Sequence, residues 1–217
     1  MSIPRRTLRA AIVGALTLIT VEAAVAVSAA AQARPDSDAV GVAMLANERL
    51  VLPGSEAHAL AERVGVWDAT FTSWEKPGAP PVVTRDLVAE REMIGPMLQE
   101  RLHPNAGSPG PSWVRIDDLT YNRTEGRWDY MSMDSRVAAG IMVAWSLDHD
   151  PASRVFLSFL PFSTPGTGRD VSGQMLRMEQ IITHQDADHE TKDQYFMSAD
   201  GVATKWLAKR YSYTRRH

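Results

Sequence analysis

The feature that most constrains the fold is a series of short β-prone segments that fills the chain from residue 65 to its end. These segments are rich in β-branched and aromatic residues, and turn-forming sequences separate them, a pattern typical of an antiparallel sheet or barrel. The break at 76–81 contains three prolines, which lack the amide hydrogen that a strand ladder needs. We expect ten strands, at 66–74, 82–93, 97–103, 113–122, 127–134, 140–147, 155–162, 171–184, 192–198 and 204–214.

Ten strands with little helix favour a closed barrel, because closure removes the exposed edges of an open sheet. The sequence therefore predicts an all-β fold, a single antiparallel up-and-down barrel of about 8–10 strands. A short helix precedes it, with Ser55 as its cap, apolar positions at Leu60 and Val64, and its end at Gly65.

The first residues have the layout of a secretory signal. Arginines precede an apolar stretch over 10–20, and Ala31 and Ala33 supply the small residues that a signal peptidase reads. Glu22 interrupts the apolar stretch, so we expect no stable membrane span after cleavage, with an uncleaved anchor as the alternative.

The signal-like start and the strand pattern together predict a signal peptide at 1–33, a flexible segment at 34–54 and a barrel domain at 55–217. It predicts a periplasmic or secreted protein. Export by either the Sec or the Tat route fits, because Arg5-Arg6 also resembles a twin-arginine signal. The oligomeric state is left open.

Composition excludes several classes of function. A net charge of −3 argues against a nucleic-acid partner, which selects for clustered Lys and Arg. The absence of cysteine excludes disulfides, thiolate metal sites and a cysteine nucleophile. The six histidines lack the spacing of a metal site, so we expect no metal and no cofactor; haem bound through His184 is the alternative.

Alternation along the strands indicates which side chains face the interior. We expect three inward rows: Trp67, Ala69 and Phe71; Trp128, Tyr130, Ser132 and Asp134; and Ile141, Val143, Trp145 and Leu147.

Charged residues also occur on the apolar faces of these strands. They are Arg91, Arg115, Asp117, Asp134 and Arg177. If their apolar neighbours point inward, so do the charges, and buried charges must then be paired. An internal network of this kind can orient a ligand carboxylate or serve acid–base chemistry. The alternative is that these faces point outward and the charges are solvated.

The short helix followed by Gly65-Val66-Trp67 resembles the opening of lipocalin-like (calycin) barrels. Over residues 56–216 the chain resembles the DUF1579 family of uncharacterised secreted bacterial proteins. The motifs that carry this resemblance are Gly65-x-Trp67, the loop at 77–81, Ile94-Gly95, Tyr121-Asn122, Tyr130 with Asp134-Ser135, Gly140-Ile141-Met142 and Tyr213-Thr214-Arg215. The resemblance implies a calycin-type barrel and no established chemistry.

In such barrels a tryptophan near the closed end plugs the base, and an arginine from a late strand covers its ring. We expect Trp67 to be this plug, with Arg210 or Arg215 over it.

The leading functional hypothesis is an exported barrel that binds a small apolar or aromatic molecule in its interior. The candidate ligand-binding residues are Phe71, Arg91, Arg115, Tyr121, Trp128, Tyr130, Trp145 and Arg177. The alternative is a cofactor-independent isomerase, cyclase or lyase, whose candidate catalytic residues are Arg115, Asp117, Tyr130 and Asp134. A structural envelope protein with a filled barrel is the third possibility, and whether the protein is an enzyme is left open.

Overall fold

The computed structural model describes residues 48–165, 172–199 and 204–217. The predicted signal peptide at 1–33 lies outside these residues, as does most of the predicted flexible segment at 34–54. In the described part of the chain, no helix has the length and apolar character needed to cross a membrane.

The described residues form a helical turn at 48–51 and the short helix α2, followed by eleven strands. Their bounds are α2 (Ser55–Ala61), β1 (Gly65–Ser73), β2 (Val82–Ile94), β3 (Met97–Pro104), β4 (Arg115–Asn122), β5 (Arg127–Asp134), β6 (Ile141–Trp145), β7 (Arg154–Phe159), β8 (Phe162–Pro165), β9 (Ser172–His184), β10 (His189–Ser198) and β11 (Trp206–Arg215).

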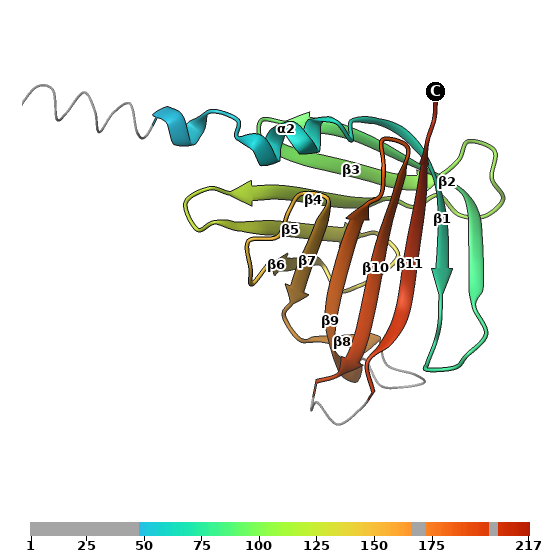
Figure 1. The fold of residues 1–217 in the computed structure, drawn as a ribbon. Helices are drawn as coiled ribbons and strands as arrows, with labels where there is room; N and C mark the ends of the chain where they lie inside the picture. Colours follow the sequence, from blue (N-terminus) through green and yellow to red (C-terminus); the bar gives the residue numbers. More distant parts are fainter. Residues whose placement is uncertain (1–47, 166–171, 200–203) are drawn as a thin grey trace, which may run out of the picture. The chain divides into compact units, whose positions relative to one another are not determined.

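The strands close into a barrel (Figure 1). Each strand from β1 to β6 pairs antiparallel with the next one, β7 pairs with β9, and β9 continues through β10 and β11 back to β1. Within the described residues ten strands form this ring, while β8 pairs with the part of β9 that β7 leaves free. The predicted antiparallel up-and-down barrel is confirmed.

The segment predicted as one strand at 155–162 is divided into β7 and β8. The division falls at Leu160-Pro161, between the two strands. Proline has no amide hydrogen to donate to the neighbouring strand, so the ladder ends there and restarts at Phe162.

Helix α2 is shorter than predicted, and its cap is different. Its N-cap residue is Gly54, with no side-chain hydrogen bond, whereas Ser55 is already helical. The helix ends at Ala61, and Val64 lies beyond it with 37% of its surface exposed. Leu60, in contrast, is completely buried in the barrel core.

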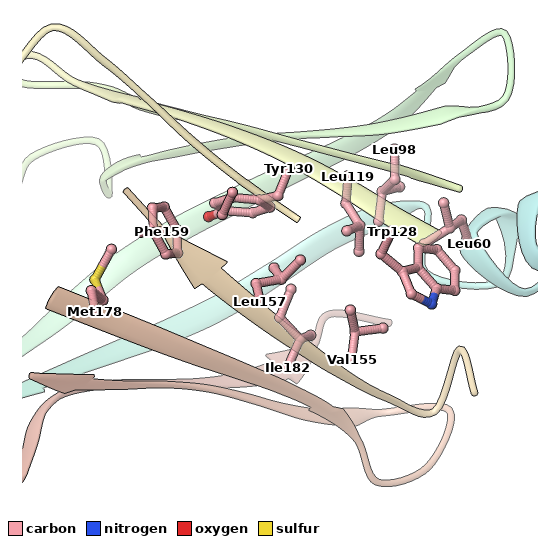
Figure 2. Close-up of a cluster of buried hydrophobic side chains, with 11 residues drawn as sticks. Leu60, Leu98, Leu119, Trp128, Tyr130, Val155, Leu157, Phe159, Met178 and Ile182 are labelled. Atoms are coloured by element: carbon pink, nitrogen blue, oxygen red, sulfur yellow. The ribbon is translucent and has the colours of Figure 1, made fainter. Parts of the chain in front are cut away.

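The apolar core beneath α2 draws on most sides of the barrel. Leu60 lies beside Trp128 in this cluster (Figure 2). The buried members are Leu60, Leu98, Leu119, Trp128, Tyr130, Ala144, Val155, Leu157, Phe159, Met178 and Ile182. Helix α2 therefore closes one end of the barrel, and its Leu60 is the side chain that joins the helix to this core.

The inward row predicted for β6 is wrong. Tyr130 pairs with Ala144, and Asp129 pairs with Trp145. Since Tyr130 is buried, Ala144 shares its inward face and Trp145 lies on the outer face. The inward row is Met142, Ala144 and Ser146, and the exposed fractions of the predicted row confirm this, with Ile141 at 63%, Val143 at 43% and Leu147 at 78%.

Candidate functional site

The interior of the barrel holds a network of buried charged side chains contributed by β2, β3, β4 and β10 and by the connection between α2 and β1. Its members are Arg63, Arg91, Glu100, Arg115, Asp117, Glu190 and Lys192. Among the described residues these are four cations and three carboxylates, so the network carries more positive than negative charge.

Arg91 lies at the centre of one half of the network. Its Nε donates to Glu100 Oε2 at 2.8 Å, and its Nη2 donates to Glu190 Oε1 at 2.8 Å. Glu190 also accepts from Arg63 Nη1 at 3.2 Å, which ties the residue that follows α2 to strand β10. A buried carboxylate needs such partners, because desolvation disfavours its charged form.

Lys192 joins this half to the other. Its Nζ donates to Glu100 Oε1 at 2.9 Å and to Asp117 Oδ2 at 2.6 Å. Asp117 also accepts from Arg115 Nε at 2.9 Å. Arg91, Arg115 and Asp117, which the alternation pattern placed on apolar strand faces, are therefore internal and paired.

The network holds its members in their charged forms. Burial raises the pKa of Asp117, but attraction from Arg115 and Lys192 outweighs burial and leaves that pKa well below its ordinary value. Burial likewise raises the pKa of Glu190, but attraction, chiefly from Arg91, outweighs burial and leaves that pKa well below its ordinary value. Burial and the nearby Asp117 carboxylate raise the pKa of Tyr130 to about 12, so its hydroxyl keeps its proton.

Trp67 is completely buried, and two guanidinium groups lie over its ring. Arg215 Cζ is 4.3 Å from the ring centroid and Arg91 Cζ is 4.6 Å from it. Arg210 does not fill this role, because it makes two hydrogen bonds to Asp193, at 2.6 and 2.7 Å, on the outer face. Alternation explains the difference, since Tyr211 and Tyr213 point inward and Arg210 points outward.

A cavity of about 210 Å³ lies at the end of the barrel opposite α2. Its inner wall consists of the buried residues Arg115, Ser132, Met178 and Gln194. Partly buried apolar side chains continue the wall, and exposed residues such as Val137 form the rim, so the cavity opens to solvent. The other lining residues are Asp134, Arg136, Ala139, Gly140, Met142, Phe162, Ser163, Thr164, Phe196 and Lys209.

Arg115 connects the cavity to the charged network. In addition to its bond with Asp117, it donates from Nη1 to the Tyr211 hydroxyl at 2.6 Å and from Nη2 to the Tyr130 hydroxyl at 3.2 Å. Three fixed acceptors thus hold the guanidinium at the base of the cavity.

Lys209 enters the cavity from β11. Burial lowers the pKa of its ammonium group, and the positive charge of Arg115 lowers it further; together with the smaller effect of Arg136 they outweigh the attraction of Asp134 and leave the pKa at about 8. Its Nζ is 5.6 Å from the centroid of the Phe196 ring. Within the described residues, Lys209 Nζ has neither a hydrogen bond nor an ion pair, whereas each cation of the network is paired with a carboxylate.

Asp134, a candidate catalytic residue, lies at the cavity but is bound to Arg136. Arg136 donates to its two carboxylate oxygens at 2.9 and 2.6 Å. Burial raises the pKa of Asp134, but these hydrogen bonds outweigh burial, so the pKa lies below its ordinary value. The Arg136 guanidinium also covers the Trp113 ring, with Cζ 3.6 Å from its centroid.

The structure separates the candidate ligand-binding residues. Phe71 packs on Tyr211, with ring centroids 4.8 Å apart, near the network rather than in the cavity lining. Tyr121 and Trp128 lie together at the α2 end, where Trp128 is part of the core and Tyr121 contacts His149. None of these three lines the cavity.

Trp145 and Arg177 were wrongly placed in the interior. Trp145 lies on the outer face of β6 beside Arg127, whose Cζ is 5.5 Å from its ring centroid. Arg177 is exposed, because Leu176 and Met178 on either side of it are the buried members of β9. In both strands the interior is lined by the neighbouring positions, one residue away.

His184, the haem candidate, lies at the α2 end and faces the network. Its Nδ1 is 3.6 Å from Glu190 Oε2, and its side chain is 16% exposed. Within the described residues, no group of three or more His, Asp or Glu side chains is arranged to hold a metal ion.

Sequence reasoning missed Lys209, Gln194 and Met178 at the cavity and Arg63, Glu100, Glu190 and Lys192 in the network. Alternation along the strands did mark members of both groups as inward-facing. Lys209 alternates with Tyr211 and Tyr213, and Glu190 alternates with Lys192 and Gln194. Either row, read as an inward face, indicates polar residues in the interior.

These observations define a class of protein, an antiparallel β-barrel with a paired charged interior and a solvent-open cavity. A solved structure, the crystal structure of Rv2717c from M. tuberculosis, is similar to this chain with a TM-score of 0.50 and 13% sequence identity. The match covers 76% of this chain and 99% of that one, and at this identity it shows the fold alone. No family model matches the chain, and no curated protein matches its sequence.

Proposed function

We propose that this protein binds a small molecule with an aromatic or apolar body and an anionic group in the cavity at the open end of the barrel. The observation that carries the proposal is the cavity itself, about 210 Å³ in volume, with apolar walls and the ammonium group of Lys209. Clefts of this kind, apolar with a few convergent polar groups, are typical ligand sites.

The volume limits the size of the ligand. A dry apolar cavity of about 150 Å³ holds benzene, so a cavity of 210 Å³ suits a single ring with a small substituent. The methionines Met142 and Met178 and the rings of Phe162 and Phe196 supply adaptable apolar contact. An aromatic carboxylate such as benzoate fits this description.

The charges of the lining favour an anion. Asp134 is neutralised by Arg136, and Arg115 is held by Asp117, so the unpaired charge that remains among the described lining residues is that of Lys209. A carboxylate that contacts this ammonium group forms a charge-assisted hydrogen bond in partly dry surroundings.

The geometry gives less support to the two alternative functions. An acid–base relay on the residues predicted from the sequence needs proton exchange near neutral pH, but two cations hold Asp117 ionised and the pKa of Tyr130 is raised to about 12. A purely structural barrel predicts a filled interior, and the cavity is at odds with that.

We also propose that the protein acts outside the cytoplasm, in the periplasm or after secretion, and that it belongs with the DUF1579 proteins that its motifs resemble. The arginine-led apolar start and the cysteine-free sequence support the first proposal. The barrel fold is compatible with the second.

Calorimetric titration with benzoate tests the binding function. We expect saturable binding at one site, lost in Met142→Trp, which fills the cavity, and retained in Val143→Trp, which places the same ring on the outer face of the same strand. Lys209→Met should weaken benzoate by roughly tenfold, the value of a charge-assisted hydrogen bond, without weakening toluene. Equal binding by the two tryptophan variants would contradict the proposal.

A further inference from the structure

The chain contains four lysines, and the structure gives each a different environment. Lys76 is exposed in the loop between β1 and β2. Lys205 pairs with Glu179 at the surface, and Lys192 donates to Glu100 and Asp117 in the network. Lys209 is the lysine that lines the cavity.

The surroundings of Lys209 are those of a reactive amine. Burial and the guanidinium group of Arg115 disfavour its charged form and together outweigh the attraction of Asp134, a carboxylate that is already bound to Arg136. With a pKa of about 8, roughly one amine in ten is neutral at pH 7, and the neutral amine is the nucleophile. A lysine desolvated beside other cations is the arrangement that activates an amine for imine formation.

We propose that Lys209 forms an imine with a small aromatic aldehyde or ketone bound in the cavity. The neutral Nζ attacks the carbonyl carbon, and a proton moves from nitrogen to oxygen to give a carbinolamine. The second amine hydrogen then leaves with that oxygen as water, and a carbon–nitrogen double bond forms. No oxidant or reductant is needed. This inference rests on the proposed function, because it requires the cavity to accept the ring.

Reductive trapping tests the inference on the full chain. Benzaldehyde and cyanoborohydride convert each imine into a stable benzyl-lysine, which peptide mapping by mass spectrometry locates. We expect Lys209 to be modified at least about tenfold faster than Lys76 or Lys205, since an ordinary lysine is neutral in only about one molecule in 2,500 at pH 7. The ratio of the Lys209 rate to the Lys76 rate should fall as the pH rises above about 8, because Lys209 is then already neutral while an ordinary lysine is still losing its proton. Excess benzoate should protect Lys209 and leave the other lysines unaffected.

Two variants complete the test. Lys209→Arg should abolish the fast reaction, and Lys205→Arg, a lysine outside the cavity lining, should leave it unchanged. Equal modification of Lys76, Lys205 and Lys209 in the natural chain would overturn the inference without reference to any variant. If benzoate binds and Lys209 is not trapped, the imine is wrong and the binding function stands. If benzoate fails to bind, the proposed function is wrong as well.

Discussion

Lys192 and Lys209 are the same type of residue in the same barrel, and their environments give them opposite chemistry. Lys192 touches two carboxylates, whose attraction outweighs burial and raises its pKa well above the ordinary value. Lys209 lies near two guanidinium groups, which add to the effect of burial, outweigh the attraction of Asp134 and lower its pKa to about 8. Neighbouring charges, rather than burial alone, decide which of the two lysines is available for binding and reaction.

The lowered pKa predicts how Lys209 affects stability. Its pKa falls from 10.5 in the unfolded chain to about 8 in the folded protein, so the charged form destabilises the folded state fully below pH 8. Between pH 8 and 10.5 the folded protein has lost this proton while the unfolded chain still holds it, so the destabilisation of the folded state decreases and disappears. Lys209→Met should therefore be more stable than the natural protein in urea at pH 7, and the difference should shrink as the pH approaches 10.5.

Lys76→Met is the control for this measurement, because it removes an exposed lysine from a loop outside the cavity. Its stability relative to the natural protein should not change across the same pH range. A Lys209→Met variant that is less stable at pH 7 would show that the ammonium group has a partner, and the proposed role for it would then fail.

Among the single elements, helix α2 buries two side chains, Ala57 and Leu60, and Leu60 is the one that belongs to the core cluster. Leu60 is fully buried against the core beneath the helix, whereas His58 on the same helix is exposed. A helix of seven residues has little stability of its own, so its position depends on this contact.

Leu60→Ala should lower the free energy of unfolding by about 2–5 kcal/mol, because it removes a buried side chain and leaves a space in the core. Urea unfolding followed by tryptophan fluorescence measures this, and His58→Ala is the matched control, with a change within about 0.5 kcal/mol. Similar small effects for both variants would mean that α2 does not close the barrel end.

The elements also show how much the sequence can predict. Most of the strands were located correctly, since Pro and Gly mark their ends, and the inward rows of β1 and β5 followed from alternation. The inward face of β6 was wrong by one residue, because Ile141, Val143 and Trp145 are apolar and yet lie outside. A shift of one residue exchanges the faces of a strand, and the loop at 135–140, rather than the strand's own pattern, sets that register.

At the scale of the whole barrel, the site could be predicted only in part. The apolar neighbours of Arg91, Arg115 and Asp117 on the same strand faces indicated an internal position for these charges. Their partners could not be found in the same way, because Arg91 meets Glu190 across 99 residues of sequence and only the closure of the barrel brings them together. The cavity likewise depends on how side chains from β4, β5, β9 and β11 fill the interior.

The buried network makes the whole barrel sensitive to acid. The pKa values of Asp117, Glu100 and Glu190 lie below their ordinary values, so these carboxylates stabilise the folded state above about pH 4 and lose that effect as the pH falls toward their folded values. Urea unfolding should show nearly constant stability from pH 7 to 5 and a loss of at least about 1.4 kcal/mol per pH unit below about pH 4.

Glu190→Gln should lower stability at pH 7 by roughly 3–5 kcal/mol, because it leaves Arg63 and Arg91 poorly paired, and it should make the acid dependence shallower. Asp68→Asn, at a surface carboxylate paired with Arg216, should change neither the stability at pH 7 nor its dependence on acid. Stability that stays constant down to pH 3 would refute the assignment of these carboxylates as ionised and paired.

An NMR titration of methionine methyl groups with benzoate tests whether the ligand site lies inside the barrel. Met142 and Met178 line the cavity, and Met175 lies on the outer face with 52% of its surface exposed. The Met142 and Met178 signals should shift together and saturate, while the Met175 signal should stay in place. Unmoved signals for Met142 and Met178, or a shift confined to Met175, would contradict a ligand site inside the barrel.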